Sequence, residues 1–203
     1  MSTLLTNGGV MRDDIKPGYT RVSQILEMLP TLSNGKWGYP MQNIDPYILA
    51  RAADRGTNVH AAIKAHWDGE FYPLDEKEQG YFESFKKWEA IIKPKHEMSE
   101  MRLYDDLTMV TGAADFIGRL GNSLMGTLID FKTTASEDKK KWPLQAAFYH
   151  YLCHVNKIEI HREVLFVKLA TDGSRPSTYE YDSNDEKIEA FAALTLFRHL
   201  TNY

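Results

Sequence analysis

Residues 112–132 read GAADFIGRLGNSLMGTLIDFK, two strand-like segments joined by a Gly-Asn pair at 121–122. Side chains two residues apart in a strand share a face, so Asp130 and Lys132 point the same way. A hairpin through the Gly-Asn pair would place the segment of Asp115 beside the segment of Asp130. Paired carboxylates repel unless a cation or a proton neutralises them. The stretch therefore predicts a divalent-metal site on one face of a sheet.

Hydrophobic spacing assigns most of the remaining chain to helices and strands. Apolar residues at helical spacing predict helices over 20–29, 45–67, 75–92, 142–155 and 184–201. Alternation predicts strands over 95–105, 109–120, 123–132, 160–169 and 177–181. Gly56 predicts a break in the second helix, and residues 31–40, around Trp37, are predicted to be a loop.

The strand–helix–strand passage from residue 130 to residue 169 is long enough for a right-handed crossover, which joins parallel strands. We therefore expect an α/β fold with a central mixed sheet flanked by helices. In the segment 95–105, strict alternation would place Met98 and Glu100 on one face and Met101 and Leu103 on the other.

The length of 203 residues predicts one domain covering 1–203. Residues 1–18 are polar and aperiodic and are expected to form a loose arm. Residues 19–94 are expected to form a helical portion, and 95–203 a sheet core with flanking helices.

Composition excludes several classes of protein. Cys153 is the single cysteine, which rules out a disulfide framework, a zinc ribbon and a cysteine-ligated iron–sulfur cluster within one chain. The sequence shows neither a membrane span nor a secretion signal, so we expect a cytoplasmic protein without a membrane partner. The net charge of −4 argues against a broad basic surface for nucleic acid, but not against an enzyme that meets phosphates through metal ions.

Four elements in chain order resemble the PD-(D/E)XK nuclease superfamily, specifically its RecB-like exonuclease branch. They are RGTNVH at 55–60, GAAD at 112–115, IDFKTT at 129–134 and LQAAFY at 144–149. Ala114 stands where the superfamily's name has proline, a departure that is common in this branch. The four cysteines of its iron–sulfur relatives are missing, so the resemblance implies no iron–sulfur cluster here.

The resemblance implies a restriction-endonuclease-like core and a metal-dependent DNA exonuclease. The implied catalytic residues are Asp115, Asp130 and Lys132. The implied metal ligands are His60, Asp115, Asp130 and the backbone carbonyl of Phe131, with Mg²⁺ or Mn²⁺ as the ion. Gln145 and Tyr149 match the family's pair that contacts the substrate. Independently, Glu100 on the preceding strand could add a carboxylate, and Glu97 lies nearby.

The predicted partner is linear DNA, single- or double-stranded, and the short chain would suit a phage or mobile-element enzyme of DNA recombination or processing. No Walker motif occurs, so any helicase or recombination partner is a separate chain, and no pattern indicates an oligomeric state. Two other functions stay open: a structure-specific or restriction-type endonuclease, and a non-catalytic DNA-binding module.

Two further patterns have a structural and a functional interpretation. The lysines at 139–141 are usually a solvated face, although they could also contact a DNA backbone. His150 and His154 share a helix face, but no acid accompanies them in a metalloprotease pattern, which favours a structural role.

Overall fold

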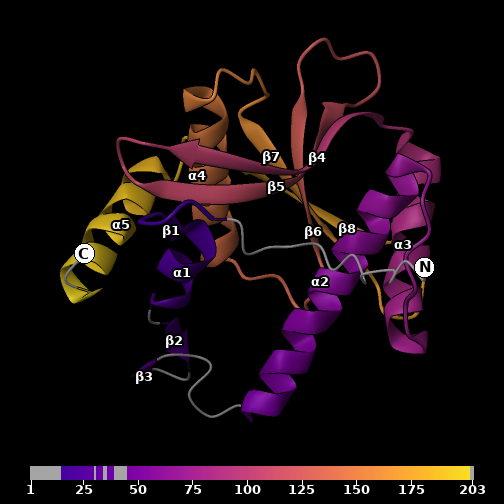
Figure 1. Cartoon of the computed structure of the whole chain (residues 1–203), viewed down its shortest axis with the longest axis horizontal. Coiled ribbons are helices and arrows are strands. Elements are labelled where there is room, and N and C mark those ends of the chain that lie inside the picture. Colours follow the sequence, from indigo (N-terminus) through magenta and orange to yellow (C-terminus); the bar gives the residue numbers. More distant parts are fainter. Residues whose placement is uncertain (1–14, 30, 34–35, 39–44, 202–203) are drawn as a thin grey trace, which may run out of the picture.

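The computed structural model describes residues 15–29, 31–33, 36–38 and 45–201. Within this part of the chain, a mixed sheet contains six strands: β1 (Thr20–Arg21), β4 (Lys95–Asp105), β5 (Val110–Arg119), β6 (Thr127–Lys132), β7 (Glu163–Lys168) and β8 (Ser177–Asp182). Strands β5, β6, β7 and β8 are neighbours in that order, β4 pairs along one edge of β5, and β1 and β6 pair with different parts of its other edge. Helices α1, α4 and α5 contribute to one apolar cluster, and α2 and α3 to another (Figure 1). The expected α/β class with a mixed central sheet and flanking helices is confirmed.

The helices of the first half follow their sequence signals. In α2 (Pro46–Asp68), the side chain of Asp45 accepts a hydrogen bond from the Tyr47 N–H, and proline occupies the first helical position. The helix α3 (Glu76–Ile92) begins with a capping box between Asp75 and Glu78. The predicted break at Gly56 is wrong, because α2 runs through it without interruption. A glycine inside a helix costs only about 1 kcal/mol, which the buried face of α2 outweighs.

The N-terminal region differs from the expectation of helices alone. The helix α1 (Val22–Glu27) is preceded by a strand, β1 (Thr20–Arg21), which pairs in parallel with β5. Strands β2 (Thr31–Ser33) and β3 (Lys36–Gly38) pair with each other where a loop was predicted. The Asn-Gly pair at 34–35 is a hairpin signal in the sequence that explains this pairing. Most of the predicted arm, residues 1–14, and the side chain of Trp37 lie outside the described residues.

The C-terminal part builds the sheet. Strands β4 (Lys95–Asp105), β5 (Val110–Arg119) and β6 (Thr127–Lys132) are antiparallel neighbours, joined beyond β6 by the crossover helix α4 (Lys141–Val155) to the parallel strand β7 (Glu163–Lys168). Strand β8 (Ser177–Asp182) and helix α5 (Lys187–Thr201) complete the described chain. The connection before β6 covers 120–126 and is longer than the expected two-residue turn, although Gly121 has the left-handed φ of 57° that such a turn needs.

Strands β4 and β5 do not alternate regularly. Met98 and Met101 both pack against the apolar cluster on the side of α4, although strict alternation predicts opposite faces. Their partners on β5, Ile117 and Ala114, belong to the same cluster. The predicted alternation through 95–105 is therefore wrong between these two pairs, and a register shift between His96 and Met98 interrupts it a second time. Glu100 lies between the two pairs and has a left-handed φ of 49°.

Two further features follow from the sequence. Cys153 is fully buried in the apolar cluster of α4, as expected for a small core residue. Among the described residues, no helix is long and apolar enough to span a membrane.

Candidate functional site

The candidate site lies beside an interruption in the sheet. On one edge of β5, β1 pairs with Val110 and Thr111, whereas β6 pairs from Phe116 to Gly118. The segment 112–115 lies between these two partners. A pocket of about 450 Å³ is lined by this segment, by Arg21 and by residues of β6, α2 and α4. The interruption therefore exposes one edge of β5 to the pocket.

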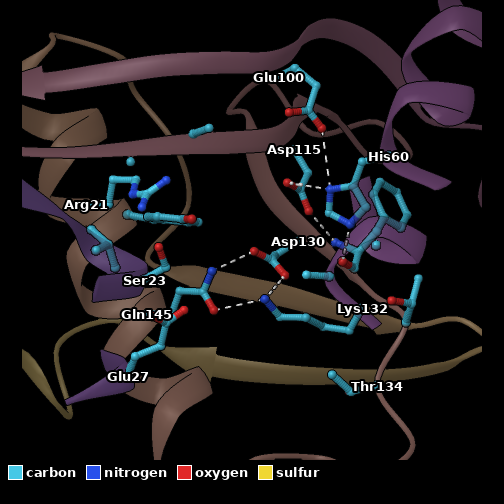
Figure 2. Close-up of a pocket in the computed structure, with 18 of the residues that line it drawn as sticks. Arg21, Ser23, Glu27, His60, Glu100, Asp115, Asp130, Lys132, Thr134 and Gln145 are labelled. Atoms are coloured by element: carbon cyan, nitrogen blue, oxygen red, sulfur yellow. Dashed lines mark hydrogen bonds and ion pairs between the residues drawn. The ribbon is translucent and has the colours of Figure 1, made fainter. Parts of the chain in front are cut away.

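Three carboxylates from adjacent strands line this pocket. Ser99 and Met101 pair with Phe116 and Ala114, so Glu100 lies opposite Asp115. The pairing of β5 with β6 runs up to Phe116 and Ile129, and the next residue on each strand is Asp115 or Asp130. Glu100, Asp115 and Asp130 thus form one row across β4, β5 and β6, which we call the carboxylate row (Figure 2).

His60 joins this row from α2. Its Nδ1 lies 3.2 Å from Asp115 Oδ1 and 3.4 Å from Glu100 Oε1, and its Nε2 lies 2.8 Å from the carbonyl oxygen of Phe131. A carbonyl can only accept, so Nε2 carries a hydrogen and donates it. Burial opposes the charged imidazole, but the nearby negative charges of Asp115 and Glu100 outweigh burial and raise the pKa of His60 well above its usual value. Without a metal ion, the raised pKa favours a cationic ring between the two carboxylates, and binding of a metal through Nδ1 would require loss of the Nδ1 proton.

Asp130 and Lys132 share a face of β6, as the alternation predicts. Lys132 Nζ lies 2.6 Å from Asp130 Oδ2, and it donates a 2.9 Å hydrogen bond to Gln145 Oε1. Gln145 Nε2 in turn donates to Asp130 Oδ1 at 2.9 Å. Gln145 on α4 thus fixes the carboxylate and the ammonium group together (Figure 2).

The two aspartates of the row have opposite pKa shifts. Asp130 is 2% exposed, and its burial raises its pKa to about 6, with Asp115 adding to the effect against the attraction of Lys132. Burial would also raise the pKa of Asp115, but His60, Lys132 and the backbone N–H of Phe131 outweigh burial and lower it. That N–H donates to Asp115 Oδ2 at 2.8 Å. Without a further cation, Asp130 is therefore the one of the two aspartates that binds a proton more readily.

Tyr149 closes one side of the pocket. Its ring packs against Gly112, where a β-carbon would lie 2.6 Å from a ring carbon. Glycine at this position therefore lets α4 approach β5 closely. Burial, with Asp130 and Asp115, raises the pKa of Tyr149, so its phenol stays protonated and able to donate.

The structure brings every sequence-predicted site residue to one pocket. These residues are His60, Glu100, Asp115, Asp130, Phe131, Lys132, Gln145 and Tyr149. Glu97, the alternative to Glu100, instead pairs with Arg119 at 2.6 Å. Their catalytic and binding roles remain predictions.

The pocket also includes residues that the sequence did not indicate. Arg21 and Ser23 reach it from the N-terminal strand and helix (Figure 2). Arg102 of β4 also lines it. Ala52, Ala53 and Gly56 of α2 border it as well. Arg21 follows a threonine in a region read as helix, and only its place in a strand beside β5 directs it to the pocket.

His60 and two members of the carboxylate row, Glu100 and Asp115, fit a divalent cation, whereas Asp130 lies outside this group. One ligand atom each from His60, Glu100 and Asp115 lies within 4.8 Å of the others, a separation that metal bonds of about 2.1–2.4 Å can bridge. His60 Nδ1 is buried but makes no hydrogen bond of good geometry within the described part of the chain. Carboxylate oxygens suit Mg²⁺ and Mn²⁺, and imidazole suits Mn²⁺ better. The Phe131 carbonyl would join these ligands only if His60 released it.

Comparison with models of known protein families finds no match, and comparison with curated proteins finds none either. Among solved structures, this chain is similar to an alkaline exonuclease (LHK-Exo) from Laribacter hongkongensis, with a TM-score of 0.46, 10% identity and coverage of 89% of this chain and 86% of that one. The structure of LHK-Exo in complex with dAMP has a TM-score of 0.43 and 13% identity, with coverage of 89% of this chain and 86% of that one. The structure of SSO0001 has a TM-score of 0.40 and 13% identity, with coverage of 90% of this chain and 78% of that one.

Proposed function

We propose that this chain is a divalent-metal-dependent deoxyribonuclease that removes nucleotides from DNA ends. The carboxylate row carries the proposal, because three acids converge on one pocket beside a histidine and a lysine. The three carboxylates outnumber the two basic groups beside them, His60 and Lys132, so a divalent cation would offset the remaining negative charge.

The residues of the pocket have distinct proposed roles. Asp115, Asp130, Glu100, His60 and the Phe131 carbonyl would hold Mg²⁺ or Mn²⁺. When bound, the ion would polarise a phosphodiester and lower the pKa of water.

Lys132 would neutralise charge that develops on the phosphate during hydrolysis, because its ammonium group lies beside the row. Gln145 holds Lys132 and Asp130 in a fixed relation through two hydrogen bonds. Tyr149, with a protonated phenol at the pocket wall, would contact the substrate.

End-dependent cleavage is favoured by the motifs at 55–60, 112–115, 129–134 and 144–149, which resemble RecB-like exonucleases in order and type. A restriction-type or structure-specific endonuclease would use the same pocket. The two differ in whether a DNA without ends is a substrate.

The test uses linear single- and double-stranded DNA labelled at either end, with closed circular forms of both, in Mg²⁺ and then in Mn²⁺. We expect mononucleotides or short products from linear DNA and none from circular DNA. Asp130→Asn and Lys132→Ala should each lower the rate of cleavage by about 10²-fold or more, whereas His154→Ala, an exposed residue outside the pocket, should retain activity. Cutting of circular DNA would favour the endonuclease, and a wild type without metal-dependent cleavage would refute the proposal.

A further inference from the structure

The connection from β6 to α4 carries a concentration of positive charge beside the pocket. We call residues 133–141 the basic loop, since it ends in Lys139, Lys140 and Lys141. Lys139 and Lys140 are exposed, and within the described part of the chain the three ammonium groups make no ion pair. This differs from the chain as a whole, whose net charge is −4.

Side chains from three other elements anchor the basic loop. Arg55 of α2 donates to the Thr133 carbonyl at 3.4 Å, and Lys168 of β7 donates to the Ala135 carbonyl at 3.2 Å. The Tyr181 hydroxyl donates to Glu137 at 2.5 Å. The loop is therefore held in one conformation before any ligand binds, which reduces the entropy lost on binding.

The acids of the basic loop are already engaged in local contacts. Glu137 accepts from Tyr181, and Asp138 Oδ1 accepts from the backbone N–H groups of Lys140 and Lys141 at 3.1 and 2.9 Å. The loop and the side chains bound to it carry five basic groups against these two acids: Arg55, Lys139, Lys140, Lys141 and Lys168. The local excess is thus positive.

The charge placement opposes helix stability. Lys140 and Lys141 stand at the first positions of α4, which has no acidic residue in its first turn. Cations at the positive end of a helix cost about 0.3–1 kcal/mol each. Asp138, whose Oδ1 accepts from the N–H groups of Lys140 and Lys141, offsets part of this cost. The lysine side chains make no ion pair within the described part of the chain, so they remain available to an anionic ligand.

The basic loop is continuous with the candidate site. It leaves β6 directly after Lys132, and its Thr133 and Thr134 line the pocket. Lys141 lies four residues before Gln145 on α4, so the two share a helix face about 6 Å apart. A chain of phosphates that reached Lys132 could therefore continue past Lys141 to Lys140 and Lys139.

We propose that the basic loop binds the phosphate backbone of the DNA whose end occupies the pocket. This rests on the proposed function, and it adds the path that the DNA follows away from the carboxylate row. The lysines contribute affinity that depends on salt, whereas the row carries the chemistry.

The test measures binding of a fluorescein-labelled oligonucleotide, single-stranded and as a duplex, by anisotropy in EDTA over a NaCl series. The slope d log K/d log[NaCl] is negative for wild type. The combined variant Lys139→Ala, Lys140→Ala, Lys141→Ala should make it less negative, by about 0.7 per lost phosphate contact for single strands and about 0.9 for duplex. In steady-state cleavage, the triple variant should have a lower kcat/KM than wild type, because its KM is higher while its kcat is unchanged.

The matched control combines Lys157→Asn with Lys187→Ala. Both lysines are exposed, and Lys157 follows the other end of α4, roughly 22 Å away for a helix of 15 residues. Asparagine suits Lys157 because its φ is 61°. This control should keep the wild-type salt slope.

The outcomes separate the two proposals. If the triple variant keeps the wild-type slope, or the wild type does not bind DNA, the basic loop is a solvated face and the inference fails. A wild type that binds with a steep slope carried by these lysines but cleaves nothing would refute the nuclease and leave the inference standing. Thermal denaturation of the triple variant should show a stability equal to or above that of the wild type.

Discussion

The two halves of the carboxylate row are built in different ways. Asp130 lies on β6, where faces alternate regularly, and its partners Lys132 and Gln145 come from the same strand and the next helix. Glu100 and Asp115 lie where β4 and β5 both break their alternation, and their partner His60 comes from α2. The half with Asp130, which we call the regular half, follows from the periods of strands and helices. The half with Glu100 and Asp115, the irregular half, depends on a left-handed backbone conformation at Glu100 and on a helix that is distant in sequence.

The largest expected difference between the halves concerns activity. Lys132→Ala should lower kcat by about 10²–10³-fold, because it removes an ammonium group beside developing charge, and added metal should not restore it. His60→Ala should lower metal affinity instead, so raising the Mn²⁺ concentration should restore part of the activity. Metal titrations of both variants on labelled linear DNA would test this. Equal rescue of both by metal would contradict the division of roles.

The metal-free protein should show opposite pH dependences for the two aspartates. The raised pKa of Asp130, about 6 against 3.8, means that its contribution to stability is fully present below pH 3.8 and is lost as pH rises through about 6. A shift of this size corresponds to about 3 kcal/mol. The lowered pKa of Asp115 acts in the other direction, so its contribution is present above pH 3.8 and is lost as pH falls.

Urea unfolding in EDTA across this pH range checks the sign. Relative to wild type, Asp130→Asn should remove the loss of stability towards neutral pH. Asp115→Asn should remove only part of it, because burial is the main cause of the raised pKa of Asp130 and the charge of Asp115 only adds to it. Burial lowers the pKa of His96 and His150, so their contribution to the stability of the protein is lost as pH falls. Both histidines are present in wild type, Asp130→Asn and Asp115→Asn, so they do not affect the comparison. An Asp130→Asn protein with the wild-type pH profile would show that Asp130 does not bind a proton in this range.

Removal of the Gln145 side chain should lower the free energy of unfolding through the regular half alone, because it contacts Asp130 and Lys132. Gln145→Ala leaves Asp130 and Lys132 each without one hydrogen bond, at a cost of about 1–3 kcal/mol in the free energy of unfolding. The matched control is Gln79→Ala, whose side chain donates to Glu83 on an exposed helix face and should change stability by about 0.5 kcal/mol or less. A similar effect at both positions would mean that the buried bridge adds no stability.

The smallest effect separates a strained position from a regular one. Glu100 has a φ of 49°, a conformation that costs an L-residue about 1–2 kcal/mol and glycine nothing. Glu100→Gly should therefore be more stable than Glu100→Ala. At the neighbouring Ser99 the order should reverse, because glycine weakens a regular strand by about 0.5–1 kcal/mol relative to alanine. The same order at both positions would remove the strain argument.

Much of the regular half could be predicted from the sequence. Strict alternation in a strand predicts that Asp130 and Lys132 share a face. Helical spacing predicts that Gln145 and Tyr149 share a helix face. Both predictions depend only on the local period of one element. The class of fold, the mixed sheet and the crossover helix follow from the order of such segments.

The remainder depends on contacts between distant parts of the chain. The short strand of Arg21 is fixed by pairing with β5, about ninety residues later, and no local pattern indicates it. The change of face at Glu100 arises from a left-handed residue that is not glycine, which sequence patterns rarely anticipate. The continuity of α2 through Gly56 reflects burial of its face, which outweighs propensity.

The buried Cys153 has a practical consequence for measuring DNA contacts. It is the single cysteine of the chain, and burial raises the pKa of its thiol to about 12. A protonated, inaccessible thiol reacts slowly with alkylating reagents, because the thiolate is the nucleophile. A cysteine introduced at Lys139 or Lys157 would therefore be the reactive one, so a fluorophore attached there would report the approach of DNA from a single known position.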